Sequence, residues 1–199
     1  MYNEQVLIIE RSAQLTVYGY TEDSRHYKAN NVTIAQKLSQ GEVPSNDLTA
    51  TLRAHNVGLR VYNINLRNDH GPGFQALAVS ALSDQQAFYG VGFIGYQDTV
   101  LADAGKQLYA RCYIDGATDF IFGRRARAWF DNVDLRLKGP GYITANGRNE
   151  TSNVGYFVIN KSSIAAASGV NVAAGSVYLG RPWQNFSRGM RLLSLPLFW

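Results

Sequence analysis

The chain has 199 residues, of which 46% are hydrophobic and 17% are charged, and this globular composition excludes a disordered or collagen-like protein. Its 19 Lys and Arg residues against 15 Asp and Glu residues give a net charge of +4, which leaves an acidic polymer open as a partner. Because the basic residues are scattered, with no aromatic RNA-binding signature and no helix-turn-helix pattern, a nucleic-acid partner is not expected.

Cysteine and histidine counts exclude further kinds of site. The single cysteine, Cys112, cannot form an internal disulfide, and the 3 histidines are scattered, so no cysteine-based zinc site is expected. We expect no cofactor. No run of about 18 apolar residues occurs, so no membrane-spanning helix is expected. At this length a single domain, 1–199, is the default.

Short β-rich runs separated by Gly, Asn and Asp predict strands along most of the chain. A short helix is conceivable at Asn31–Leu38, and Gln40–Asp47 is typical of a loop because it contains Gly, Pro and Ser. The expected strands, in chain order, are Val6–Ile9, Leu15–Tyr18, Leu59–Leu66, Phe88–Ile94, Leu108–Ile114, Ala128–Leu137, Tyr156–Ile164 and Ser176–Leu179.

Four of these runs repeat one six-residue pattern, with apolar residues at positions one, four and six. The windows begin at Val61, Phe88, Tyr109 and Phe130, so they are spaced by 27, 21 and 21 residues. Short strands at a period near 21 indicate a solenoid, in which each coil stacks on the last. The pattern predicts an all-β parallel β-helix, with an outward loop in the longer interval. A β-sandwich is the alternative, and the fixed register argues against it. Cys112 then falls in a buried column, as a core thiol rather than a reactive one.

Two acidic residues share one place in this repeat. Asp98 lies five residues after Phe93, and Asp119 lies five residues after Ile114. Since parallel neighbours are about 4.8 Å apart, the two carboxylates should stand side by side on one outer face. Paired carboxyl groups cannot easily both ionise, and their pKa values separate, as acid/base or covalent catalysis requires. A pair of solvated surface acids is the alternative.

Groups suited to acyl-transfer chemistry lie near these acids. Gln97 precedes Asp98, and Gln75 lies 22 residues before Gln97, one coil away. Amide N–H groups there can bind an oxyanion, although a stacked amide ladder would place them equally well. Downstream, Arg181 can pair with a carboxylate and Trp183 can pack on a sugar ring. As alternatives, Arg181 is a structural ion-pair partner and Trp183 a core residue.

These motifs, taken in order, resemble the pectin methylesterase family (pectinesterase, carbohydrate esterase family 8), and its fungal branch in particular. Any one tetrapeptide is a weak signal, but four in the right order and spacing across nearly the whole chain are a strong one. The motifs are Gln75-Ala-Leu-Ala, Tyr96-Gln-Asp-Thr, Asp119-Phe-Ile-Phe-Gly and Leu179-Gly-Arg-Pro-Trp.

The resemblance implies a right-handed, single-stranded parallel β-helix of the pectin-lyase-like type and a metal-free hydrolysis of methyl esters in pectin (homogalacturonan). It implies that Asp119 is the nucleophile and that Asp98 is first the acid and then the base. Gln75 and Gln97 would stabilise the oxyanion, and Arg181 would hold Asp119 ionised. The sugar groove would be lined by Trp183, Phe122 and Tyr96.

The ends of the chain depart from the family pattern. The likeness fades after Trp183, and the last residues, 192–199, are an apolar run that we expect to form an exposed edge. Met1–Ile9 has no signal-peptide pattern. We therefore expect a domain incomplete at both ends, derived from a secreted, extracellular and monomeric parent. The alternatives to an esterase are a polysaccharide hydrolase or lyase on the same fold, and an inactive pectin-binding fragment.

Overall fold

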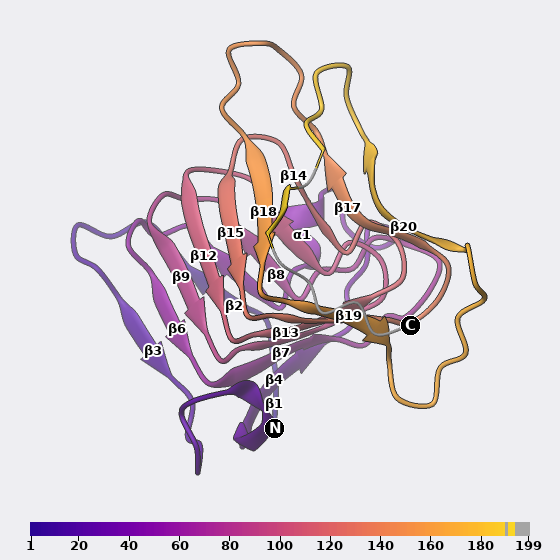
Figure 1. Cartoon of the computed structure of the whole chain (residues 1–199). Coiled ribbons are helices and arrows are strands. Elements are labelled where there is room, and N and C mark those ends of the chain that lie inside the picture. The colour runs from indigo at the N-terminus through magenta and orange to yellow at the C-terminus, as the bar shows by residue number, and fades with distance from the viewer. Residues whose placement is uncertain (190, 194–199) are drawn as a thin grey trace.

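Three parallel sheets, wound coil upon coil, make up the protein (Figure 1). The computed structural model describes residues 1–189 and 191–193. Sheet A consists, in order, of β1 (Tyr2–Asn3), β4 (Val32–Gln36), β7 (Ile64–Asn68), β10 (Gly92–Ile94), β13 (Tyr113–Gly116), β16 (Asp134–Leu137) and β19 (Ser163–Ala166). Each coil contributes one strand to each sheet, so the fold is the expected all-β parallel β-helix.

The other two sheets continue the same path. Sheet B consists of β2 (Val6–Ile8), β5 (Leu52–Ala54), β8 (Val79–Ala81), β11 (Val100–Ala102), β14 (Ile121–Gly123), β17 (Gly141–Asn146) and β20 (Val177–Pro182). Sheet C consists of β3 (Thr16–Tyr18), β6 (Arg60–Tyr62), β9 (Gln86–Tyr89), β12 (Lys106–Ala110), β15 (Arg127–Asp131), β18 (Tyr156–Asn160) and β21 (Arg191–Leu193). The expected edge at 192–199 falls on residues whose side chains lie outside the described part of the chain.

The predicted repeat register is confirmed by strand pairing. Val61 pairs with Phe88, Phe88 with Tyr109, and Tyr109 with Phe130. All four side chains are buried, and the Tyr109 ring stacks on those of Phe88 and Phe130 at centroid distances of 5.0 and 4.5 Å. Cys112 is fully buried in the same core, so the prediction of a core thiol is confirmed. These columns of apolar side chains supply the hydrophobic stabilisation that parallel coils require.

Each repeat window is two strands rather than the single strand that we predicted. Its third residue lies in the left-handed region, with φ of 53° at Asn63, 59° at Gly90, 53° at Arg111 and 54° at Asn132. This residue turns the chain from sheet C into sheet A. The window Leu59–Leu66 is accordingly divided into β6 and β7.

The prediction of a short helix at Asn31–Leu38 is wrong, because this segment contains β4, which pairs with β1 and β7. Its β-branched residues Val32, Thr33 and Ile34 fit a strand once neighbouring coils are present. The one α-helix in the described residues is α1 (Asn46–Thr49), at the end of the segment expected to be a loop. Ser45 caps it, since its Oγ accepts a hydrogen bond from the Leu48 N–H at 3.4 Å.

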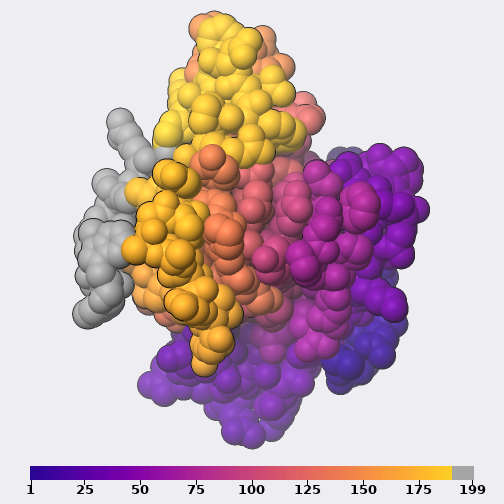
Figure 2. Space-filling model, turned by 90° about the vertical axis from the view of Figure 1, so that its right-hand side faces the viewer, coloured from indigo at the N-terminus to yellow at the C-terminus, as the bar shows by residue number. Residues whose placement is uncertain are grey.

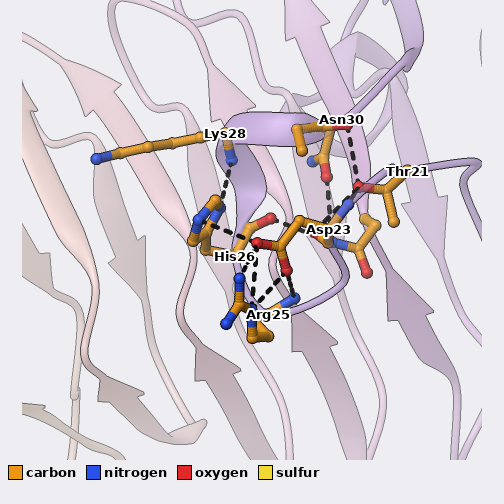
Figure 3. Close-up of polar contacts among 8 residues, drawn as sticks. Thr21, Asp23, Arg25, His26, Lys28 and Asn30 are labelled. Carbon is orange, nitrogen blue, oxygen red and sulfur yellow. Dashed lines mark hydrogen bonds and ion pairs between the residues drawn. The ribbon is translucent and has the colours of Figure 1, made fainter.

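A strap formed by residues 20–31 precedes β4 and contains the 3₁₀ helix η1 (Tyr27–Ala29). Polar contacts fold it on itself, with Asp23 accepting hydrogen bonds from Arg25 and the Lys28 N–H donating to His26 (Figure 3). Asn30 ties the strap to the coils by donating to the Gly90 carbonyl at 2.9 Å. The strap therefore packs on the corner between sheets C and A, whereas the predicted site residues lie elsewhere.

Candidate active site

Asp98 and Asp119 lie in the turns that lead from sheet A into sheet B on successive coils. Residues 95–99 join β10 to β11, and residues 117–120 join β13 to β14. The Asp98 N–H donates to the Thr118 carbonyl at 3.1 Å, and Gln97 pairs with Thr118 in a parallel bridge. The two aspartates are therefore neighbours across the coils, as the repeat predicted.

Both aspartates have unusual backbone and solvent environments. Their φ angles are 62° and 51°, in the left-handed region that is uncommon for residues other than glycine, and their exposed fractions are 7% and 6%. Burial, followed by the charge of Asp119, raises the pKa of Asp98 from 3.8 to about 8. At neutral pH the Asp98 carboxyl therefore holds its proton beside Asp119.

Arg181 on β20 binds Asp119 in a fork-to-fork ion pair. Its Nε donates to Oδ1 at 2.9 Å and to Oδ2 at 3.1 Å, and a terminal nitrogen of the guanidinium donates to Oδ2. The hydrogen bond with Asp119 raises the pKa of Arg181. Arg181 comes from two coils further on, because Phe122 pairs with Ala145 and Ala145 pairs with Arg181 along the outer face of sheet B. The arginine orients the carboxylate and leaves Asp98 without such a partner in the described residues.

Gln75 and Gln97 lie on adjacent coils at the same corner. The Ala76 N–H donates to the Gln97 carbonyl at 3.2 Å, which brings the two segments together. Both side chains are half-buried, and neither side-chain amide has a hydrogen-bond partner within the part of the chain that the structure describes. Their N–H groups are thus free to donate to a ligand beside Asp98 and Asp119.

The predicted groove residues differ in their exposure. Phe122 is only 3% exposed and belongs to a cluster with Leu101 and Ala145 on the outer face of sheet B. Trp183 packs against this cluster, with its ring 6.2 Å from that of Phe122 and inclined to it by 63°. Tyr96 is half-buried, and its carbonyl accepts a hydrogen bond from the Ala117 N–H at 2.7 Å. Trp183 therefore offers more surface than Phe122 to a ligand.

Two long loops rise at the top of the molecule in Figure 1. Residues 147–155 follow β17 and residues 183–189 follow β20, and Figure 2 shows their orange and yellow atoms together at the top of the molecule. Arg148 joins the loops, since its guanidinium donates to the Phe186 carbonyl at 2.9 Å. The loops form a wall at one side of the candidate site.

The described residues contain no group of three or more His, Cys, Asp and Glu side chains placed to hold a metal ion. Among those same residues, no helix has the length and apolar character needed to cross a membrane.

Comparison with known proteins decides the family. The family model described as pectinesterase matches residues 1–195. The chain belongs to the pectinesterase family.

Relatives within this family agree in sequence and fold. A pectinesterase from Aspergillus aculeatus is 50% identical over 192 residues, which are 94% of this chain and 58% of that protein. The crystal structure of the pectin methylesterase from Aspergillus niger superimposes with a TM-score of 0.91 at 40% identity, covering 97% of this chain and 69% of the other. A pectin methylesterase in complex with hexasaccharide VII has a TM-score of 0.74 at 26% identity, covering 92% of this chain and 59% of the other. The chain thus spans little more than half the length of its first curated relative.

Sequence reasoning missed several residues at this candidate site. Tyr142 and Tyr178 stack at 5.4 Å, and the Arg181 guanidinium lies 5.8 Å from the Tyr142 ring. Arg124 lies over the Trp183 ring at 4.7 Å. No simple repeat points to the tyrosines, because the chain between β17 and β20 does not keep the 21-residue period. Arg124 could have been identified from the sequence, because it directly follows the motif that contains Phe122.

Proposed function

We propose that the protein hydrolyses the methyl esters of pectin and releases methanol and pectate. The observation that carries this proposal is the buried pair of Asp98 and Asp119, of which Arg181 binds only the second. The pair provides one protonated carboxyl beside one arginine-bound carboxylate, the combination that an acid and a nucleophile require. The family supports the ester substrate.

The first half of the reaction forms an acyl-enzyme. An Asp119 oxygen attacks the ester carbonyl carbon, and the carbonyl oxygen becomes an oxyanion to which Gln75 and Gln97 donate hydrogen bonds. When the tetrahedral intermediate collapses, the bond to the methoxy oxygen breaks. The Asp98 proton moves to that oxygen, and methanol leaves. The resulting mixed anhydride joins Asp119 to the galacturonate carboxyl carbon.

The second half returns the enzyme to its starting state. Asp98, now ionised, accepts a proton from water, and the water oxygen attacks the galacturonate carbonyl carbon. Collapse breaks the bond to Asp119, which regains its carboxylate, and leaves the galacturonic acid carboxyl. Asp98 is protonated again. Asp98 is the only protein group that exchanges a proton in these steps, so they do not need a histidine.

The test is methanol release from methylated pectin. We expect the wild-type chain to release methanol and Asp119→Ala to lower the rate by at least about 10³-fold, because the nucleophile is absent. Asp131→Asn serves as the control, since Asp131 lies on sheet C and pairs with Asn160. Undiminished release by Asp119→Ala would refute the assigned nucleophile.

Products distinguish the alternatives. New reducing ends or unsaturated products would identify a hydrolase or a lyase, for which two close carboxyls are also suited. Pectin binding by folded wild-type protein without methanol release would identify a binding fragment. The two free amides beside the aspartates favour the esterase, because an oxyanion site suits acyl transfer rather than glycosidic cleavage.

A further inference from the structure

An ion pair between buried Asp115 and half-buried Lys138, outside the proposed chemistry, lies directly beside the turn that carries Asp98. Asp115, the third residue of β13, is 4% exposed, and its Oδ1 accepts a hydrogen bond from Lys138 Nζ at 3.2 Å. Burial raises the pKa of Asp115, and Lys138 opposes that shift. Burying a carboxylate is unfavourable unless it is well paired, so the position of this pair calls for a reason.

Both members of the pair bind the first residue of the turn 95–99. The Gly95 N–H donates to Asp115 Oδ1 at 2.9 Å, and Lys138 Nζ donates to the Gly95 carbonyl at 2.8 Å. Side chains from the next two coils thus bind the donor and the acceptor of one peptide residue. Two charge-assisted hydrogen bonds of this kind fix the beginning of the turn.

The end of the same turn is bound by the backbone of Asp115. Thr99 Oγ1 donates to the Asp115 carbonyl at 2.8 Å, and the space around Gly95 is so tight that an added Cβ would lie 2.6 Å from that Oγ1. Asp98 lies between these two attachments with a φ of 62°. A left-handed aspartate is unfavourable by itself, so its surroundings must hold it there.

The equivalent positions on neighbouring coils do not repeat this arrangement. On the next coil the position equivalent to Asp115 is Arg136, and on the previous coil it is Ile94 of β10. The pairing of β10, β13 and β16 through backbone hydrogen bonds does not require a carboxylate here. Among these described coils, the ion pair therefore occurs only beside the turn that carries Asp98, and it joins the coil of Asp119 to the coil after it.

We propose that Asp115 and Lys138 are positioning residues, whose ion pair holds the turn 95–99 so that Asp98 faces Asp119 in the geometry that ester hydrolysis requires. The inference rests on the proposed function. Neither residue touches the reacting atoms, and both act through Gly95.

Asp115→Asn tests the inference, because it keeps the shape of the side chain and an oxygen for Gly95 but removes the charge that Lys138 binds. We expect kcat for methanol release to fall by about 10- to 100-fold, as a displacement of about 1 Å at a reacting group produces, with KM changed by less than about twofold. The double variant Asp115→Asn/Lys138→Gln removes the unpaired ammonium and should show the same fall in kcat.

Asp134→Asn is the matched control. Asp134 lies on the same face of sheet A, one coil further, and its ion pair with Arg136 at 2.8 Å and its hydrogen bond from Tyr27 at 2.6 Å do not involve the turn 95–99. It should retain wild-type kcat even if its free energy of unfolding falls.

Two readouts separate positioning from general destabilisation. Amide hydrogen exchange within residues 95–99 should become about tenfold faster in Asp115→Asn but not in Asp134→Asn, while exchange in the core strands stays slow. The alkaline limb of kcat/KM should also move to lower pH in Asp115→Asn only. Asp98 becomes better hydrated when the turn loosens, although Asp119 and Arg181 still face it.

Unchanged exchange of 95–99, or a kcat equal to that of Asp134→Asn, would overturn the inference and leave the esterase proposal intact. A wild-type chain that releases no methanol while folded would overturn the proposed function, and this inference with it.

Discussion

Asp98 holds a proton at neutral pH because the fold places it out of water beside a second carboxylate. Its pKa of about 8 comes first from burial and then from Asp119, while Arg181 acts in the opposite direction. A carboxyl group that keeps its proton at pH 7 can act as an acid toward a departing alkoxide. The same environment must make the native state less stable as pH rises toward this pKa, and that consequence is measurable without substrate.

Asp98→Asn should stabilise the protein increasingly as pH rises from about 4 to about 8. In this interval the unfolded chain has lost the Asp98 proton, which the native state still holds, so unfolding becomes more favourable by up to about 1.4 kcal/mol per pH unit. Asparagine stays neutral in both states and removes this dependence. Urea unfolding of both proteins at several pH values measures the difference, which should grow up to about pH 8 and then level off. A difference that does not change with pH would contradict the raised pKa.

At the residue scale, the repeat alone could predict that Asp98 and Asp119 are neighbours. Their turns keep the 21-residue period, and parallel coils bring equal positions together. The contact of Arg181 with Asp119 spans 62 residues and crosses coils of unequal length, so spacing could not place it. The resemblance to the family supplied that pairing. Asp115 and Lys138 were missed because buried polar contacts between coils leave no pattern in a single sequence.

At the scale of elements, the corner between sheets C and A explains why each repeat window contains two strands. A strand alternates inward and outward residues, yet the windows are apolar at positions one, four and six. In an unbroken strand, residues three positions apart would face opposite sides. The left-handed residue at position three reverses the alternation, so that Val61 and Ile64 both point inward. The break in the pattern was therefore the signal for the corner. Strand β4 was not recognised because it lies outside the four windows that keep the repeat pattern.

Arg111→Asn should stabilise the protein by about 0.5–1 kcal/mol. Arg111 is exposed and has a φ of 53°. It lies at the corner between sheets C and A, where the other coils have Asn63, Gly90 and Asn132. Asparagine tolerates the left-handed region better than arginine does, and it does not add the unfolded-state entropy of glycine. Thermal or urea unfolding measures the gain. Lys106→Asn, at an exposed strand position of β12, is the control and should give no gain; equal effects of the two variants would contradict the argument.

At the scale of the whole molecule, the net charge of +4 suits the proposed reaction, which creates negative charge on its substrate. Each ester that is hydrolysed leaves a carboxylate on the polymer. Arg124 is exposed at the end of β14 and lies over Trp183 at the wall of the candidate site, whereas its neighbour Arg125 forms an ion pair with Asp103 at 3.1 Å. A positive surface in this place attracts polymer that has already been partly de-esterified.

Salt should therefore weaken binding of partly de-esterified pectin more than binding of fully methylated pectin. Raising the ionic strength from about 0.01 M to about 0.1 M shortens the screening length from about 30 Å to about 10 Å, which removes long-range attraction but leaves short contacts. We expect KM for the partly de-esterified polymer to rise several-fold and kcat to stay constant. Fully methylated pectin has almost no charge to screen and serves as the control substrate. Equal changes in KM for the two polymers, or none for either, would show that the positive charge near Trp183 does not act on the substrate.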